Sequence, residues 1–188
     1  MPNYKFSIKE VVLFIVAITM AATSGFYLQQ FLARNDVPDE TISNSFINKP
    51  AHEFAIKDIE GKVRNITDWK GKVVLLNFWA TWCPPCLREI PAFVSLQNKY
   101  KNANFQIVGL AMDKLEDVKI FAKDMGINYP ILVTEIEAME LARLYGNTVG
   151  ALPFSVFINE KGVVTHTIVG ELSMFKAEKI IAELNIKQ

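Results

Sequence analysis

Cysteine and histidine, two residue types with reactive side chains, are scarce in this chain. Its 188 residues contain only two cysteines, Cys83 and Cys86, so any disulfide within the chain joins these two. That bridge closes too short a loop to stabilise a fold through chain entropy, so its value lies in being formed and broken. A zinc site would need both histidines, His52 and His166, and neither shows ligand spacing.

Net charge is also absent, because 20 basic residues balance 20 acidic ones. This balance gives no reason to expect a nucleic acid partner. Hydrophobic residues make up 51% of the chain, enough for a core that needs no disulfide support. The length suits one ordinary domain with an appendage.

The appendage is the N-terminal region, where residues 11–33 carry no charged side chain and are mostly apolar. About 20 such residues span a bilayer. Lys5 and Lys9 precede the stretch and acidic residues dominate after it, so the positive-inside rule keeps residues 1–10 in the cytoplasm. We expect a single-pass signal-anchor in the cytoplasmic (inner) membrane, with the rest of the chain on the periplasmic or extracytoplasmic side.

A cleaved signal peptide is the alternative reading of this region. Small residues at 21–25 suit a cleavage site, but the apolar run continues past them and exceeds a typical signal core, which favours the anchor. Residues 34–50 are polar and predict a linker. Residues 51–188 then form the folded domain.

The cysteines lie between two patterned segments. The nearly unbroken apolar run 72–80 predicts a strand buried on both faces, and apolar residues at helical spacing follow the cysteines. Cys83 falls near the N-cap, and Pro84 and Pro85 occupy the first turn, where a missing amide costs nothing. A helix start lowers a thiol pKa, so Cys83 is the candidate attacking thiol and Cys86 the candidate resolving thiol.

The remaining periodicities predict an α/β domain with a mixed sheet. Expected strands cover 53–59, 63–66, 72–80, 105–112, 129–133, 154–158 and 163–169. Expected helices cover 84–101, 116–125, 136–145 and, with Ser173 as its cap, a last helix to about residue 184.

Residues 73–91, VVLLNFWATWCPPCLREIP, resemble the thioredoxin fold. They are most similar to its membrane-anchored TlpA/ResA-like thiol-disulfide oxidoreductases, within the redoxin branch. The resemblance covers roughly residues 47–188. It implies an enzyme with a central mixed sheet flanked by helices, an N-terminal β-hairpin and a central αβ insertion over 113–146. We expect neither a cofactor nor a metal.

The resemblance also assigns a docking surface for the partner chain. Leu152 and Pro153 match the family's cis-proline, which faces the cysteine pair and offers backbone to the bound chain. Trp82 is expected at the rim, next to Pro84 and Pro85. An ordinary trans proline before a strand is the alternative at position 153.

Glu89, three residues after Cys86, matches an active-site acid of the ResA-like proteins and is a candidate for proton transfer. The alternative is a solvated side chain paired with Arg88 or a nearby lysine. Asn77 departs from the buried Asp that many cytoplasmic thioredoxins carry six residues before the first cysteine. Because an amide cannot shuttle protons, any acid function falls to Glu89.

The expected activity is the reduction of disulfides in protein substrates, with a membrane thiol electron carrier as the reductant. The resemblance implies cytochrome c maturation as a pathway, with apocytochrome c or its maturation proteins as partners.

Three other functions of the same fold are alternatives. A dithiol oxidase is disfavoured because Pro84 and Pro85 place no positive charge between the cysteines. A thiol peroxidase is disfavoured because Thr81 lies one residue too close to Cys83 for a Thr-x-x-Cys site. A copper-binding assembly factor would combine the cysteines with His166, but the cysteine spacing is one residue short of the Cys-x-x-x-Cys that such factors show.

Overall fold

The computed structural model describes residues 46–186 together with Ile8, Lys9, Leu13, Ile15, Ile18, Met20 and Thr23. Within that part of the chain, no helix is both long enough and apolar enough to cross a membrane. The predicted segments 1–10, 11–33 and 34–50 lie almost entirely outside the described residues. The chain divides into two units, 1–41 and 42–188, and the sheet and helices of the fold belong to the second.

The strand β3 (Val73–Trp79) is the centre of a five-stranded mixed sheet, and all seven of its residues are buried. On one side it pairs in parallel with β4 (Phe105–Ala111), which pairs in parallel with β5 (Ile131–Val133). On the other side it pairs antiparallel with β6 (Phe154–Ile158), which forms a hairpin with β7 (Val164–Val169). The mixed sheet predicted from the sequence is confirmed.

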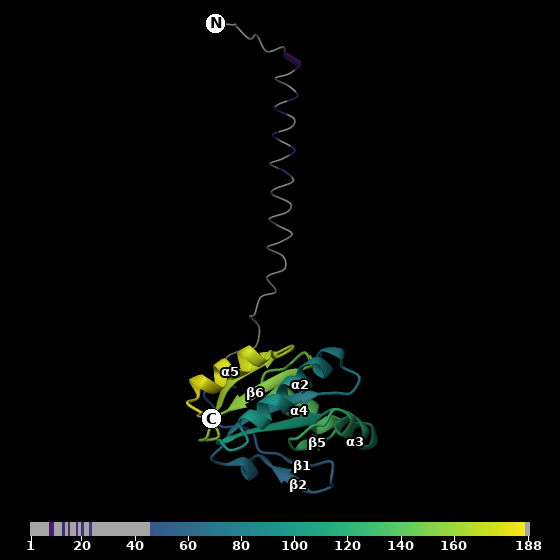
Figure 1. Ribbon diagram of the computed structural model, residues 1–188, viewed down its shortest axis with the longest axis vertical. Coiled ribbons are helices and arrows are strands. Elements are labelled where there is room, and N and C mark those ends of the chain that lie inside the picture. Colours follow the sequence, from purple (N-terminus) through teal and green to yellow (C-terminus); the bar gives the residue numbers. More distant parts are fainter. Residues whose placement is uncertain are drawn as a thin grey trace. The chain divides into compact units, whose positions relative to one another are not determined.

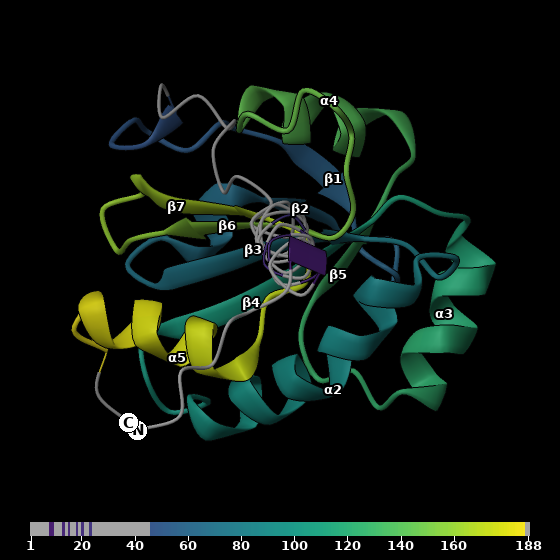
Figure 2. The same cartoon turned by 90° about the horizontal axis from the view of Figure 1, so that it is seen from above.

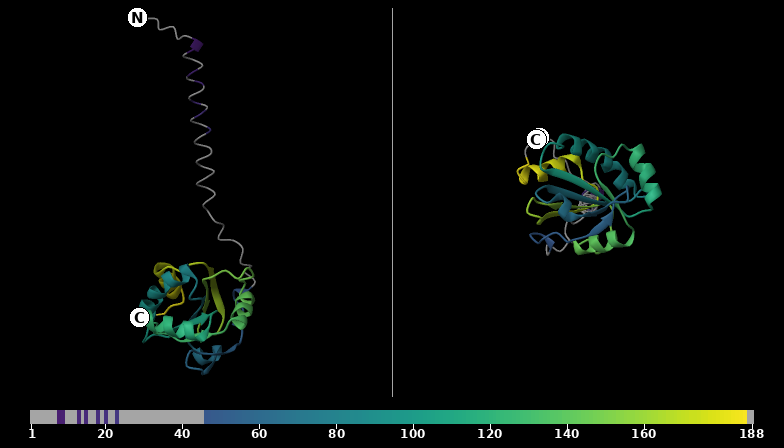
Figure 3. Two further views of the ribbon diagram at one scale, coloured as in Figure 1. Left: turned by 90° about the vertical axis from the view of Figure 1, so that its right-hand side faces the viewer. Right: turned by 90° about the horizontal axis from the view of Figure 1, so that it is seen from below.

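Helices cover both faces of this sheet, as Figure 2 shows. The helices α2 (Pro84–Lys99), α3 (Leu115–Asp124) and α5 (Met174–Glu183) bury their apolar residues in one core cluster, against one face. The helix α4 (Ile136–Leu144) packs in a second cluster on the opposite face. Seen from below in Figure 3, α5 (yellow) and α2 (teal) again lie together on one side.

A small antiparallel hairpin precedes the main sheet. It consists of β1 (Ala55–Lys57) and β2 (Val63–Asn65), and the 3-10 turn η2 (Ile66–Trp69) follows (Figure 1). The carboxylate of Asp58 closes its turn by accepting two backbone amides and the side chain of Arg64 at 2.7 Å. The predicted N-terminal hairpin is therefore confirmed, as a sheet of its own.

The ends of the helices follow their sequence signals. The hydroxyl of Ser173 accepts the amide of Lys176 at 3.3 Å and caps α5, as predicted. Gly126 and Gly146 follow α3 and α4 with φ of 61° and 99°, a conformation that glycine adopts without a Cβ penalty.

Residues 46–50, the end of the predicted linker, already belong to the fold. The amide of Asn48 donates to the carbonyl of Val164 at 2.8 Å, and Pro50 forms a bridge with Val163. Packing of the domain therefore begins a few residues before Ala51.

Gly109 of β4 has a steric role. A Cβ atom at this position would lie 3.0 Å from Nε1 of Trp79 and 3.3 Å from the ring of Tyr129. The indole of Trp79 thus occupies the space that any larger residue at 109 would need.

We predict that Phe93→Ala lowers the free energy of unfolding by about 3–5 kcal/mol, because Phe93 is fully buried between α2 and the sheet. Phe175→Ala is the matched control, since Phe175 is 78% exposed and should change stability by less than about 0.5 kcal/mol. Urea unfolding of both purified variants measures the difference. Equal losses would contradict the placement of α2.

Candidate active site

The ends of several strands meet at one edge of the sheet. The parallel strands β3 and β4 finish side by side, and the antiparallel β6 begins there because Phe154 pairs with Phe78. The loop carrying the cysteines therefore leaves the sheet beside Pro153. The chain after β7 returns to the same place, where the amide of Gly170 donates to the Pro153 carbonyl at 2.8 Å.

Cys83 is the N-cap of α2 and is bonded to Cys86 in a disulfide with a Cα–Cα distance of 5.3 Å. Pro84 and Pro85 occupy the first two helical positions and have no N–H. The first free helical amide is therefore that of Cys86, and it donates to the sulfur of Cys83 at 3.3 Å. Cys86 is completely enclosed, whereas Cys83 retains 4% exposure. Cys83 is thus the more accessible residue of the pair.

Glu89 lies on the buried face of α2 with only 2% exposure. Its Oε1 accepts from the amide of Asn77 at 2.7 Å, and its Oε2 accepts from the backbone amide of Leu172 at 2.8 Å. Burial raises the pKa of Glu89 to about 7; the two hydrogen bonds oppose this rise and the charge of Glu171 adds to it. The alternative of a solvated Glu89 paired with Arg88 is wrong, because Arg88 pairs with Glu171 at 2.8 Å.

The side chain of Asn77 on β3 connects Glu89 to the neighbouring strand β6. Asn77 and Ser155 are direct partners across β3 and β6, and the Asn77 amide also donates to the Ser155 hydroxyl at 3.1 Å. Two buried side-chain atoms in the described part of the chain have no hydrogen-bond partner: Oδ1 of Asn77 and Nε1 of Trp79. Ser155 gave no signal in the sequence, because only the register reveals that it faces Asn77.

The predicted docking residues differ in exposure: Trp82 and Pro84 are exposed, Pro85 and Leu152 are partly buried, and Pro153 is buried. Trp82 is 65% exposed next to Cys83, and Val149, which was not among the predicted residues, is 82% exposed in the loop before β6. The Leu152–Pro153 peptide bond is cis. Asn147, which sequence reasoning missed, holds this loop by accepting the amide of Ala151 at 3.0 Å and donating to its carbonyl at 2.8 Å.

Asp113 is a second residue that sequence reasoning missed. Its carboxylate accepts both the backbone amide and the hydroxyl of Thr81, and so fixes the loop just before the cysteines. These hydrogen bonds help to hold its pKa below the usual value, against the effect of burial. An acid directly after the second buried strand is a usable signal, because the ends of parallel strands meet at one edge.

His166 lies in β7, as the sequence predicts for an ordinary sheet residue, and its Nε2 is 3.5 Å from the carboxylate of Glu183. No three His, Cys, Asp or Glu side chains within the described residues are grouped as metal ligands.

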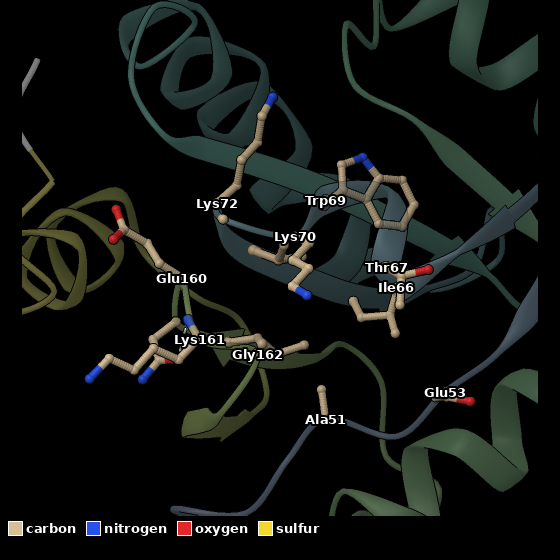
Figure 4. A pocket seen from close by; sticks show the side chains of 14 residues that line it. Ala51, Glu53, Ile66, Thr67, Trp69, Lys70, Lys72, Glu160, Lys161 and Gly162 are labelled. Carbon is tan, nitrogen blue, oxygen red and sulfur yellow. Dashed lines mark hydrogen bonds between the residues drawn. The ribbon is translucent and has the colours of Figure 1, made fainter.

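A cavity of about 200 Å³ lies elsewhere, between η2, the start of β3 and the β6–β7 turn (Figure 4). Trp69 forms part of its wall, and Lys70, Lys72 and Lys161 line it. The three lysine side chains extend in different directions and do not converge on one anion. No residue of the cysteine site lines this space.

A redox-active Cys-x-x-Cys at a helix start, beside a cis-proline and on a thioredoxin fold, defines the thiol-disulfide oxidoreductases. The chain belongs to the AhpC/TSA family, whose model matches residues 47–167.

Proteins that are similar to this chain carry names of the same class. The chain is 33% identical over 172 residues to the thiol-disulfide oxidoreductase ResA of Bacillus thuringiensis (strain Al Hakam), covering 90% of this chain and 93% of that protein. It is 32% identical over 168 residues to the thioredoxin-like protein YneN of Bacillus subtilis, covering 88% and 92%. A thiol:disulfide interchange protein of Chlorobium tepidum superposes with a TM-score of 0.66 at 34% identity, covering 73% and 96%. The protein is a thiol-disulfide oxidoreductase of the ResA type.

We predict that Glu89 makes the oxidised protein less stable as the pH rises. Its pKa is about 7 when folded against an ordinary value of 4.5, so between these values the folded state holds a proton that the unfolded chain releases. The free energy of unfolding should fall from pH 4.5 to 7 by the order of 3 kcal/mol, with the loss complete above pH 7. Denaturant unfolding across this range measures it. Glu89→Gln should remove this component, and an unchanged pH dependence in that variant contradicts the assignment.

Proposed function

We propose that this enzyme reduces disulfides in protein substrates outside the cytoplasmic membrane. The observation that carries the proposal is the start of α2. One backbone amide reaches the sulfur of Cys83, since both residues between the cysteines are prolines. Arg88, the nearest positive charge in sequence, pairs with Glu171. A thiolate with so little stabilisation favours the oxidised pair, so the reduced pair readily gives up its electrons.

The reaction is a dithiol-disulfide exchange. The Cys83 thiolate attacks one sulfur of the substrate disulfide, and the other substrate sulfur leaves as a thiolate. Cys86 then attacks the Cys83 sulfur, breaks this mixed disulfide and releases the second substrate sulfur. Two electrons pass from the cysteine pair to the substrate. The Cys83–Cys86 disulfide that remains is the form described here.

Glu89 is the proton acceptor in this scheme. The resolving thiol must lose its proton before it attacks, and Cys86 is completely buried away from water. Glu89 follows it by three residues on α2, which places both on one helix face. With a pKa of about 7, this carboxylate can take and return a proton near neutral pH.

The N-terminal stretch and the family support a proposal for the location and the partners. The apolar residues 11–33 would anchor the enzyme in the inner membrane and place its domain where disulfides persist. A membrane thiol carrier would restore the reduced pair. Proteins of cytochrome c maturation, including apocytochrome c, are the substrates we propose.

Trapping tests the roles of the two cysteines. Cys86→Ala should accumulate mixed disulfides on Cys83, because no second thiol remains to resolve them. Mass spectrometry of the trapped species names the partners. Cys83→Ala is the matched control and should trap none; stable adducts on Cys86 in that variant would reverse the assignment.

The reduction potential tests the direction of the reaction. We expect a value nearer that of thioredoxin, about −270 mV, than that of the strongest dithiol oxidases, about −120 mV. Pro85→His should raise the potential by about 30 mV or more, because an imidazolium between the cysteines stabilises the thiolate. Equilibration with glutathione measures both. A wild-type value near the oxidising end would overturn the reductase assignment.

A further inference from the structure

The two carboxylate oxygens of Glu89 have different partners. Oε2 faces the backbone amide of Leu172 at 2.8 Å, and Oε1 faces the side-chain amide of Asn77 at 2.7 Å. A backbone N–H can only donate, and the carbonyl oxygen of a neutral carboxyl group accepts better than its hydroxyl oxygen, so Oε2 keeps the acceptor role. When Glu89 gains a proton, that proton therefore resides on Oε1.

A proton on Oε1 conflicts with the orientation of the Asn77 amide in the structure, in which Nδ2 points at Oε1. In that orientation Nδ2 donates both of its hydrogens, one to Glu89 and one to the Ser155 hydroxyl at 3.1 Å. A protonated Oε1 would then place a donor against a donor. The enclosed Oδ1 of Asn77 meanwhile has no partner among the described residues.

A half-turn of the Asn77 amide removes the conflict. Oδ1 then accepts the O–H of Glu89, and it also accepts the hydroxyl of Ser155, which can rotate to donate. We propose that Asn77 is a positioning residue that serves both protonation states of Glu89, by turning its amide over when Oε1 gains or loses its proton.

This inference rests on the proposed role of Glu89 as proton acceptor and deepens it. Asn77 makes two hydrogen bonds in either orientation, and one of its polar atoms is left over in each. The carboxyl group can therefore exchange a proton without repacking of the core around α2. An aspartate at position 77 could not do this, because two carboxylates at this separation compete for one proton.

Among the described residues, Glu171 and Tyr129 are the ionisable groups that interact with Glu89 in the oxidised protein. Glu171, adjacent to Leu172, raises the pKa of Glu89, and it is itself paired with Arg88 on the surface. Burial, with a smaller effect of Glu89, raises the pKa of the Tyr129 phenol, so Tyr129 stays neutral near pH 7. The cysteines are joined and do not titrate.

Nuclear magnetic resonance on the oxidised full-length chain in detergent tests the proposal without substrate. The side-chain carboxyl carbon of Glu89 reports its protonation, and labelled Asn77 reports the amide. Nuclear Overhauser effects from the Asn77 amide hydrogens to the Ser155 β hydrogens should be present above the Glu89 midpoint and lost below it. Effects that persist at pH 5 while Glu89 is protonated would show a fixed amide and overturn the proposal.

Two variants extend the test. Asn77→Leu keeps the branched shape of the side chain but removes the hydrogen-bond partner of both protonation states. The bond to the charged carboxylate is the stronger of the two, so the Glu89 midpoint should rise, by less than about one pH unit. Gln97→Leu is the matched control: this buried amide on α2 bonds to the amide of Ile107 at 2.7 Å, and its loss should leave the midpoint in place. A rise of about two pH units in Asn77→Leu is what a fixed donor to the carboxylate alone gives, and it also overturns the proposal.

The two proposals fail separately. A fixed amide leaves the reductase assignment intact, because these spectra need no substrate. Absence of disulfide reduction would leave the coupling between Asn77 and Glu89 measurable.

Discussion

Burial of β3 on both faces is the constraint on which the rest of this domain depends. A strand without a solvent-facing side is mostly apolar, and a polar side chain in it can find hydrogen-bond partners only inside the protein. Asn77 is the one residue of β3 outside the apolar and aromatic types. Its contacts with Glu89 and Ser155 tie α2 and β6 to the central strand. The requirement that packs the core thus also assembles the acid beneath the cysteines.

Patterns that are local in sequence predicted much of this structure. The apolar run before Cys83 and the helical spacing after it suffice to place the redox pair at the junction of β3 and α2. Contacts set by register between distant segments were not predictable. Ser155 is distinguished only by facing Asn77 across the sheet, and Asp113 by following β4 at the point where its carboxylate reaches Thr81. The burial of Glu89 depends on Leu172, which lies 83 residues further along the chain.

Hydrogen-bonded loops hold the backbone on both sides of Cys83 in place. The sulfur of Cys83 lies at the end of a helix, while Asp113 and Asn147 hold the loops on either side through paired hydrogen bonds. Trp82 and Val149 stand out from these loops toward solvent. A partner chain would thus meet a surface whose backbone is already ordered, which lowers the entropy lost on binding.

Gly109 has a consequence for how sequences of this fold can vary. The space that a side chain at 109 would need is occupied by the indole of Trp79, whose Nε1 lies 3.0 Å from where a Cβ would be. The two positions therefore share one volume, and neither can change size independently of the other. A larger residue at 109 becomes compatible with the core only together with a smaller one at 79. Substitutions at the two sites should consequently be coupled rather than additive.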